Sequence, residues 1–323
     1  MKAAPYYADV ADGPQSGHAY WLTTSDGLRI RAGVWPLDTE TAHDTGPDTP
    51  KGTVFILPGR TECIEKYGRG ARDLAALGYA SLAIDWRGQG IADRQLSNRN
   101  IGHVVSFSDY QYDLKAVIDM ADTLKLPQPY FLIGHSMGGA IGLRAVINGA
   151  HPFKAAVFSA PMWGIGLNVI QRILVKLAAP LLSALGLSGM IALGTRQKPY
   201  MLWKPFKGNK LTSDRDMYNY MAHQVVAHPD LSLGGPSVRW VQESMRENKQ
   251  VAALSAPDLP ALCFLGSDEK IVHTDEVRTR VANWASCELV EIAGGRHEIP
   301  METPAIRAEF YGKSAALFDT QLS

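Results

Sequence analysis

The pentapeptide at residues 134–138 constrains the fold of this chain more than any other feature of its sequence. It reads Gly-His-Ser-Met-Gly, follows the apolar run 131–133, and is itself followed directly by a helical pattern. A serine on such a tight turn between strand and helix needs glycine on both sides, because side chains there would crowd it. The turn lifts the hydroxyl off the sheet and aims a helix N-terminus at it, where negative charge is stabilised. We therefore predict a nucleophile elbow at Ser136.

The rest of the chain alternates short apolar runs with helical patterns. Residues 20–24 and 28–35 predict an antiparallel pair around the turn at Asp26 and Gly27. Further apolar runs predict strands buried on both faces, at 53–57, 80–85, 130–133, 155–159, 261–265 and 288–292. Helical patterns separate them at 67–77, 110–124, 140–148, 275–284 and 305–318. This alternation predicts an α/β fold, with a mostly parallel central sheet and helices on both faces.

One interval is too long for a plain crossover between strands. Residues 162–260 carry mostly helical patterns, so we predict a helical cap inserted into a core domain of residues 1–161 and 261–323. Within the cap, apolar residues fall on one helical face and either pack on the core, lie on a bilayer or admit an acyl chain. This face comprises Val169, Ile170, Ile173, Leu174, Leu177 and Leu181. The uncharged stretch 177–195 is broken by Pro180 and three glycines, so we expect no membrane-spanning helix there.

Composition narrows the partners and the compartment. The 32 basic and 32 acidic residues cancel, which gives no support for a nucleic-acid partner. Cys63, Cys263 and Cys287 are odd in number and far apart, as expected for free thiols in a reducing compartment. Residues 1–17 contain no apolar stretch of a secretory signal. We expect a cytoplasmic protein, and leave open a peripheral contact of the cap with the inner membrane face.

A serine hydroxyl becomes a nucleophile when a base accepts its proton and a carboxylate orients that base. Asp268 follows the predicted strand 261–265, and His297 follows the predicted strand 288–292. Because parallel strands end at one edge of the sheet, we predict a triad of Ser136, His297 and Asp268. Glu269 and Asp275 are the nearest alternative carboxylates. Taken singly, the three residues would be a turn serine, a loop histidine and a helix cap.

The remaining site residues follow from the same geometry. Backbone amides of Met137 and Arg60 are the expected oxyanion donors, since both follow strand ends beside the serine. We expect Gly59, His135 and Trp163 beside the substrate, with the His135 ring packed below the sheet edge. His223 and His228 lack a partner acid at metal-binding spacing, so we expect neither a metal site nor a cofactor.

Five stretches of the chain resemble the α/β-hydrolase superfamily, and within it the bacterial lysophospholipase and monoacylglycerol lipase branch. They are residues 56–67, 85–90, 134–139, 266–272 and 295–299. The resemblance implies an α/β-hydrolase fold, a serine esterase that uses no cofactor, and a lipid ester with one acyl chain as substrate. Pro58 departs from the pattern, because many relatives carry histidine there. The expected oxyanion donor lies two residues further on, so we expect the oxyanion hole to survive.

Two other functions remain open. A carboxylesterase of small or medium-chain esters would use the same triad, and a non-catalytic binding module would use the same fold. All three triad positions are filled, which disfavours the second, and Ser136 disfavours chemistry that needs an aspartate nucleophile. Four cations lie in motifs near the expected site and serve either a phospholipid head group or salt bridges with Glu62, Glu65 or Asp85. They are Arg60, Lys66, Arg87 and Arg296.

Overall fold

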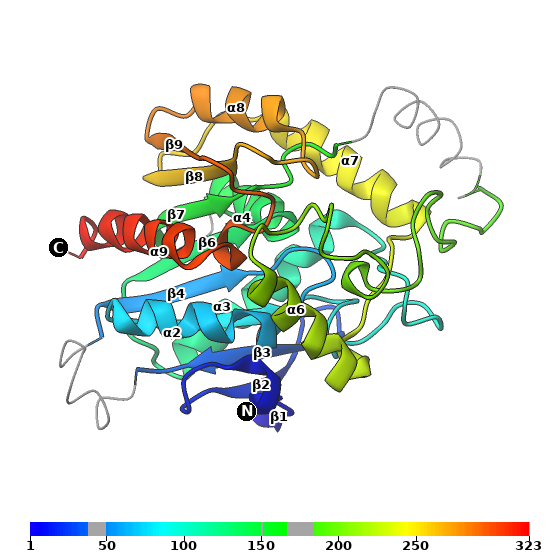
Figure 1. Ribbon diagram of the computed structural model, residues 1–323, viewed down its shortest axis with the longest axis horizontal. Helices are drawn as coiled ribbons and strands as arrows, with labels where there is room; N and C mark the ends of the chain where they lie inside the picture. Colours follow the sequence, from blue (N-terminus) through cyan, green and yellow to red (C-terminus); the bar gives the residue numbers. More distant parts are fainter. Residues whose placement is uncertain (38–49, 150, 167–181, 183, 323) are drawn as a thin grey trace.

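A nine-stranded sheet forms the centre of the protein in its computed structural model (Figure 1), which describes residues 1–37, 50–149, 151–166, 182 and 184–322. The strand order is β1-β2-β3-β5-β4-β6-β7-β8-β9. Strands β1 to β3 and their junction with β5 are antiparallel, and all remaining neighbours are parallel. The strands are β1 (Lys2–Ala4), β2 (His18–Thr23), β3 (Arg29–Trp35), β4 (Gly52–Leu57), β5 (Tyr79–Asp85), β6 (Tyr130–His135), β7 (Phe153–Ser159), β8 (Ala261–Gly266) and β9 (Cys287–Ile292). The predicted fold class is confirmed, and only the three-residue β1 was too short for its pattern to be recognised.

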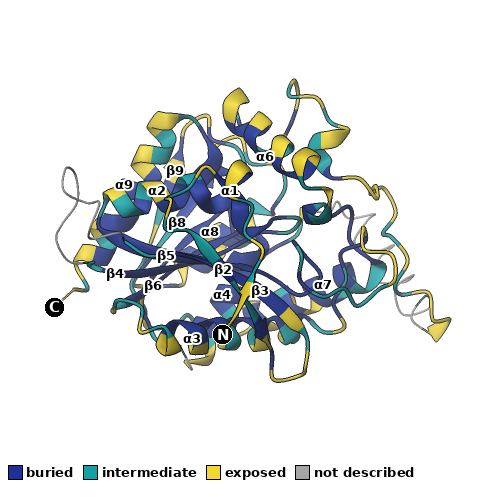
Figure 2. Cartoon of the chain, turned by 90° about the horizontal axis from the view of Figure 1, so that it is seen from below, coloured by how far each residue is buried: buried dark blue, intermediate teal, exposed yellow. Residues whose placement is uncertain are grey.

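Helices cover both faces of this sheet. Apolar residues of α3 (Tyr110–Thr123), α4 (Met137–Asn148) and α8 (Thr274–Ala282) belong to the hydrophobic core on one face. Residues of α2 (Gly68–Ala76) and α9 (Pro304–Asp319) belong to the core on the other. The two layers are visible in Figure 2, where α2 and α9 lie above the sheet and α3 and α4 below. Short elements complete the core: α1 (Ala8–Ala11), η1 (Ile64–Tyr67), η2 (Phe107–Asp109) and η5 (Ile299–Met301).

Strand β4 shows why continuous apolar runs fold in this way. All six of its residues are buried, with Phe55 and Leu57 in one core and Val54 and Ile56 in the other. Successive side chains of a strand point to opposite faces, so a strand covered on both sides must be apolar throughout. The dark central strands in Figure 2 show this burial across the sheet. Because β4, β6, β7, β8 and β9 pair in parallel, their carboxyl ends lie at one edge of the sheet.

The segment between β7 and β8 is an excursion from the sheet. Its described elements are η3 (Tyr200–Leu202), α6 (Arg215–Ala227), η4 (Pro229–Leu231) and α7 (Val238–Ala252). Met217 and Met221 of α6 join one core, and Trp240 and Val251 of α7 join the other. Figure 1 shows α6 and α7 at the end of the sheet toward which the arrow of β4 points. This segment therefore covers the edge at which the predicted site residues gather.

Two expectations for this segment concern residues that the structure describes only in part. The predicted amphipathic face from Val169 to Leu181 lies outside the described residues. In the part of the chain that the structure describes, no helix is both long and apolar enough to cross a bilayer.

Candidate active site

Ser136 lies on a strained turn between β6 and α4. Its backbone has φ +48° and ψ −114°, a conformation that costs a residue other than glycine about 1–3 kcal/mol. Its amide donates to Ser159 O (3.0 Å), and its carbonyl accepts from Met162 N (2.8 Å), so the end of β7 and the segment after it hold the turn. A Cβ on Gly138 would lie 2.0 Å from Leu57 O, which explains why the turn requires glycine there. The predicted nucleophile elbow is present.

The base reaches the serine from the other end of the chain. His297 follows β9, and its Nε2 lies 3.0 Å from Ser136 Oγ, although 161 residues separate them in sequence. The His297 side chain is 5% exposed. Such a distance lets the imidazole accept the serine proton. The predicted juxtaposition of Ser136 and His297 is therefore found in the structure.

The carboxylate on His297 is Glu269 and not Asp268. Glu269 Oε2 lies 2.7 Å from His297 Nδ1, and its side chain is 1% exposed. Its Oε1 accepts the amides of Ile271 (2.5 Å) and Val272 (3.2 Å), which fix the carboxylate. Asp268 is exposed at the turn after β8, where its amide donates to Gly295 O (2.9 Å). The expectation for Asp268 was wrong because two carboxylates stand side by side there, and the turn directs the second one inward.

The surrounding charges favour a protonated imidazole. Burial lowers the pKa of His297, but the carboxylates of Glu269, Glu298 and Glu62 outweigh burial, so its pKa is raised. Burial raises the pKa of Glu269, yet His297 and the amides of Ile271 and Val272 hold it below its usual range. The carboxylates of Glu269, Glu298 and Glu62 therefore stabilise the imidazolium form of His297.

The loop after β4 engages two of its backbone amides and leaves the one between them without an acceptor among the described residues. Glu62 Oε2 accepts the amide of Gly59 (2.5 Å), and Gln89 Oε1 accepts the amide of Thr61 (2.6 Å). Thr61 has φ +69°, so the chain turns sharply here. The amides on either side of Arg60 are thus engaged, while the hydrogen bonds of the described residues include none from the amide of Arg60 itself. This is the position expected of an oxyanion donor.

Side chains of Trp86 and Gln89 support the loop although Pro58 stands where many relatives carry histidine. Trp86 Nε1 donates to Pro58 O (2.9 Å), and Gln89 Nε2 donates to Gly59 O (3.2 Å). Met137, the second expected donor, is the first residue of α4, where amides lack helical partners and the helix dipole is positive. Both expected donors therefore come from backbone that neighbouring side chains or a helix hold in place.

A cavity of 490 Å³ opens at Ser136 and His297. The core supplies its charged side chains, Arg60, Glu62, Lys66 and Glu298. The insertion supplies mainly apolar walls: Met162, Ile165, Leu182, Ala192, Leu193, Met201, Leu211, Met221, Val225, Pro236, Val238, Trp240 and Val241. An apolar cavity with few polar groups at one point is the usual form of a site for a small organic ligand.

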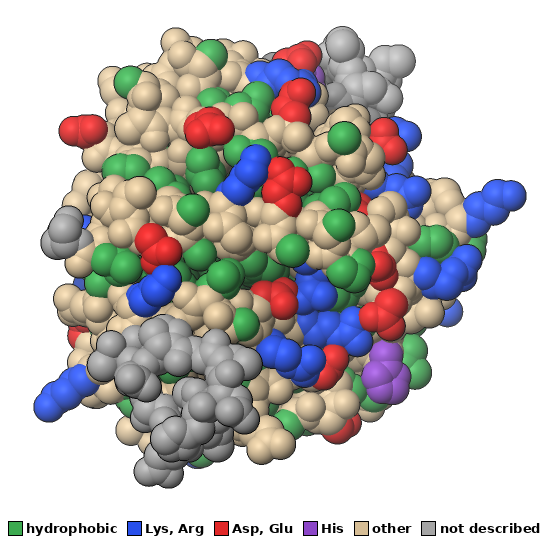
Figure 3. Space-filling view, turned by 60° about the vertical axis from the view of Figure 1, so that its left-hand side comes forward, with side chains coloured by type: hydrophobic (Ala, Val, Ile, Leu, Met, Phe, Trp, Pro, Cys, Tyr) green, Lys and Arg blue, Asp and Glu red, His purple; other side chains and the backbone are tan. Residues whose placement is uncertain are grey.

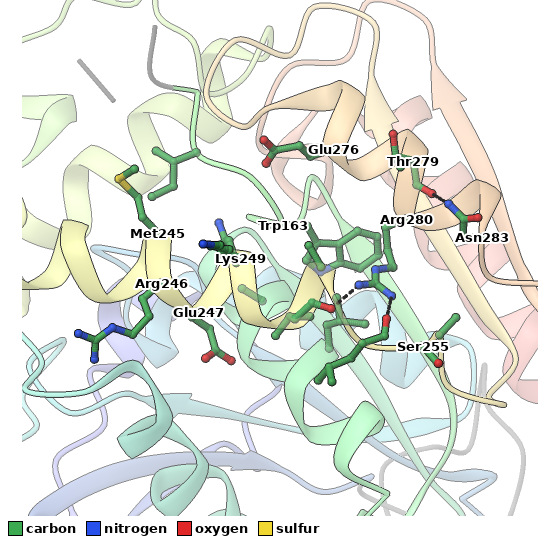
Figure 4. Close-up of a pocket in the computed structure, with 18 of the residues that line it drawn as sticks. Trp163, Met245, Arg246, Glu247, Lys249, Ser255, Glu276, Thr279, Arg280 and Asn283 are labelled. Atoms are coloured by element: carbon green, nitrogen blue, oxygen red, sulfur yellow. Dashed lines mark hydrogen bonds between the residues drawn. The ribbon is translucent and has the colours of Figure 1, made fainter. Parts of the chain in front are cut away.

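None of the three residues expected beside the substrate lines this cavity. Trp163 donates from Nε1 to Gly139 O (3.1 Å) and lines a separate cavity of 940 Å³ between α4, α7 and α8 (Figure 4). That cavity contains neither Ser136 nor His297. Met162, the preceding residue, faces the reactive cavity instead, because neighbouring residues after β7 point in opposite directions.

His135 and Gly59 lie behind the cavity wall. The buried ring of His135 has Nδ1 3.1 Å from Ser159 O and Nε2 3.1 Å from Glu298 Oε2. Its centroid lies 4.9 Å from that of His297, so it supports the base from behind. Gly59 is turned toward Glu62, and a Cβ there would lie 2.7 Å from Glu62 Oε1. The expectation that these two residues contact the substrate was therefore wrong, whereas the expected packing of His135 below the sheet edge agrees with its burial.

A buried charge network connects the oxyanion loop to the segment after His297. Lys66 Nζ lies 2.7 Å from Glu62 Oε1 and 2.6 Å from Glu298 Oε2, and all three side chains are nearly inaccessible. Tyr67 donates its hydroxyl to Glu62 Oε2 (2.6 Å). Glu62, His135 and Glu298 offer ligand atoms close enough to hold a cation, but Lys66 already supplies a positive charge between the carboxylates. Sequence patterns missed this network, because Lys66 and Glu298 are 232 residues apart.

Replacing Lys66 with methionine is expected to lower the free energy of unfolding by about 3–5 kcal/mol, because the change leaves two buried carboxylates without their counter-charge. Urea denaturation near neutral pH measures this loss. Lys313→Met is the matched control, since Lys313 pairs with Glu309 at a half-exposed surface and should cost about 0.5 kcal/mol or less. A loss below about 1 kcal/mol for Lys66→Met would show that the ammonium contributes little to this network.

Comparisons with known proteins agree with this geometry. The family model described as serine aminopeptidase, S33, matches residues 48–304. Lysophospholipase L2 of Escherichia coli (strain K12) is 31% identical, over 79% of this chain and 76% of its own length. Probable lysophospholipase L2 of Haemophilus influenzae is 27% identical, over 79% of each chain. The structure of a monoglyceride lipase from Saccharomyces cerevisiae superimposes with a TM-score of 0.71 at 21% identity, over 94% of this chain and 95% of that one. This last likeness shows a shared fold.

Proposed function

Since this chain belongs to the serine aminopeptidase S33 family of α/β-hydrolases and is a carboxylic ester hydrolase, we propose that its substrate is a lipid with one acyl chain, a lysophospholipid or a monoacylglycerol. One observation carries the proposal: Ser136 Oγ and His297 Nε2, 3.0 Å apart, open into a cavity whose walls are mainly apolar. An acyl chain is the substrate part that such walls favour. The relatives named lysophospholipase and monoglyceride lipase support the same substrate class.

The reaction is two-step acyl transfer to water. His297 accepts the proton of Ser136 as its oxygen attacks the ester carbonyl, and Glu269 holds the imidazole and stabilises its positive charge. The amides of Arg60 and Met137 donate to the oxyanion of the tetrahedral intermediate. The imidazolium then protonates the leaving alcohol, and a water activated by His297 releases the fatty acid. In this scheme the chain's own residues supply every proton transfer.

The cavity favours esters over the amino-terminal peptides suggested by the family's description. Binding an α-ammonium group requires a carboxylate that is free to pair with it. Glu62 and Glu298, the carboxylates of the described cavity lining, both contact Lys66. A substrate ammonium would have to displace that buried lysine, so an aminopeptidase activity is not expected.

Activity should fall on the acid side of neutrality with a midpoint above the ordinary histidine pKa of about 6.5. Only neutral imidazole accepts the serine proton, and the carboxylates of Glu269, Glu298 and Glu62 raise the pKa of His297 despite its burial. A profile of kcat/KM between about pH 5 and 9 measures the midpoint. A midpoint at or below that of free histidine would contradict this electrostatic account.

A substrate panel tests the proposed activity. It compares lysophosphatidylcholine and monoacylglycerol of one acyl chain, p-nitrophenyl acetate and butyrate, and an aminoacyl p-nitroanilide. We expect the highest kcat/KM for the two lipids and no cleavage of the anilide. Predominant turnover of the acetate and butyrate esters would instead identify a small-ester carboxylesterase.

Residues 162–260 act in this proposal as a cap on a catalytic core of residues 1–161 and 261–323, and the cap contacts membrane lipid. Within residues 185–210, six large apolar side chains are exposed and five cations occur without any acidic residue. By contrast, cations and acids are interspersed on the face shown in Figure 3. The apolar side chains are Leu185, Leu187, Met190, Leu193, Leu202 and Trp203, and the cations are Arg196, Lys198, Lys204, Lys207 and Lys210. Leu193 also lines the reactive cavity, so contact with lipid would bring the cavity mouth to its substrate.

Vesicle binding tests this contact. Sedimentation with phosphatidylglycerol-containing vesicles should be roughly 30-fold weaker for the double variant Lys198→Gln/Lys207→Gln, since each cation near an anionic surface contributes about 1 kcal/mol. Lys125→Gln/Lys154→Gln is the control, because these exposed lysines precede β6 and begin β7, at the opposite end of the sheet. Equal binding of the two double variants would exclude the cap as the contact.

A further inference from the structure

Arg60 differs from Lys66, the other cation of the described cavity lining, in forming no ion pair with a described carboxylate. The described lining contains two cationic side chains, Lys66 and Arg60. Lys66 is neutralised by Glu62 and Glu298. Arg60 forms no ion pair with any described residue, and its guanidinium Nη1 donates to Gly234 O (2.8 Å). No described carboxylate therefore forms an ion pair with this guanidinium, and Glu62, whose charge acts on it from nearby, is already bound to Lys66.

The other two arginines of the recognised motifs do not compete for this role. Arg87 is paired with Asp113 (2.8 Å) and Asp26 (2.7 Å). Arg296 donates to Thr212 O (2.7 Å) and is absent from the cavity lining. The alternative that the motif cations form salt bridges with Glu62, Glu65 or Asp85 thus holds for Lys66. Arg87 is paired too, but with other carboxylates than those expected, and Arg60 forms no ion pair with a described residue.

The surroundings of Arg60 hold its guanidinium in place without neutralising it. Its Cζ lies 5.6 Å from the centre of the Trp240 ring, a cation–π contact. A Cβ on Gly102 would lie 3.5 Å from its Nη1, so small residues leave space around the group. Desolvation by burial lowers the pKa of Arg60 to about 10. A guanidinium has five N–H donors, and Gly234 accepts from only one nitrogen, which leaves donors for an anionic ligand.

The arginine side chain has the same length in bonds as the arm that joins the ester to the phosphate of the substrate. The amide of Arg60 is the expected oxyanion donor, and its guanidinium is at the other end of the same residue. The same number of bonds separates amide nitrogen from guanidinium carbon as separates ester carbonyl carbon from phosphorus in a 1-acyl lysophospholipid. One residue can thus contact the developing oxyanion with its backbone and the phosphodiester with its side chain.

We propose that the Arg60 side chain is the phosphate-binding group of this site, and that it selects lysophospholipids over monoacylglycerols. The inference rests on the proposed lipid-ester hydrolase function and names the head-group chemistry of its substrate. Arginine binds phosphate through two parallel hydrogen bonds, and such bonds are strongest where water is excluded. A monoacylglycerol offers a neutral hydroxyl at the same position and gains nothing comparable.

Arg60→Met tests the assignment because it removes the guanidinium and keeps the backbone amide. The kcat/KM on lysophosphatidylcholine should fall by about 10- to 100-fold more than the kcat/KM on monoacylglycerol of the same chain length. Glycerophosphocholine, the leaving group, should inhibit monoacylglycerol hydrolysis competitively in the wild type and much less in the variant. Arg60→Lys keeps the positive charge but lacks the planar guanidinium. Its kcat/KM on lysophosphatidylcholine should lie between that of the wild type and that of Arg60→Met.

Arg94→Met is the matched control. Arg94 also donates only to backbone carbonyls and also has its pKa lowered to about 10 by burial, but it does not line the cavity. It should keep the wild-type ratio between the two lipids. An equal loss on both lipids in Arg60→Met and Arg60→Lys would mean that Arg60 only positions the loop, and no loss on either would leave it without a role. Both outcomes overturn the inference, whereas a wild type that hydrolyses neither lipid would refute the proposed function itself.

Discussion

Replacing Glu269 with glutamine is expected to lower kcat by about 10³- to 10⁴-fold, while Asp268→Asn should change it by less than about threefold. The Glu269 carboxylate lies 2.7 Å from His297 Nδ1, where it fixes the tautomer and balances the imidazolium charge. Glutamine has nearly the same shape but no charge, and its NH2 group cannot accept the Nδ1 proton. Steady-state kinetics on monoacylglycerol measures both variants.

The two variants control one another, since they change adjacent carboxylates by the same chemistry. Glutamine at position 269 can still accept the amides of Ile271 and Val272, so the turn should keep its shape. Loss of that negative charge should also lower the pKa of His297 and shift the acid limb of any residual activity to lower pH. A large loss in Asp268→Asn with near-normal kcat in Glu269→Gln would restore Asp268 as the acid of the triad.

Replacing Ser136 with alanine is expected to lower kcat by about 10⁴- to 10⁶-fold and to abolish labelling by a fluorophosphonate. Only the serine oxygen lies 3.0 Å from His297 Nε2, and an alanine there leaves no atom to form the acyl-enzyme. Alanine keeps the same strained backbone at φ +48°, so the fold and the substrate affinity should be retained. Labelling followed by mass spectrometry, together with initial rates, gives both readouts.

Ser244→Ala controls for the loss of a buried serine hydroxyl. Ser244 is fully buried on α7, and its hydroxyl donates to Val241 O (2.9 Å), away from the reactive cavity. The Ser244→Ala variant should react with the fluorophosphonate and hydrolyse substrate at the same rates as the wild type. Fluorophosphonate labelling at another residue in Ser136→Ala, with activity retained, would show that the elbow serine is not the nucleophile.

Most elements of the core follow from local patterns. The apolar run at 53–57 predicted β4 to within one residue, and the helical pattern at 110–124 predicted α3. The elbow was equally readable, because a strand, a glycine-flanked serine and a helix are neighbours in sequence. Trp163 shows the limit of such reasoning. It follows β7 near the reactive serine, as expected, but its indole lines a different cavity, and Met162 lines the reactive one. Side-chain direction after a strand depends on the packing around it.

The sequence by itself determined the layered sheet, the serine at its edge and the histidine that must meet it, because periodicity and tight turns depend on residues close along the chain. Tertiary structure alone decided which of two adjacent carboxylates reaches His297, and which cation of the cavity lacks a partner. Those outcomes depend on distances of a few ångströms between residues far apart in sequence, such as Lys66 and Glu298. A turn that places one side chain in solvent and the next in the core leaves no periodic pattern in the sequence.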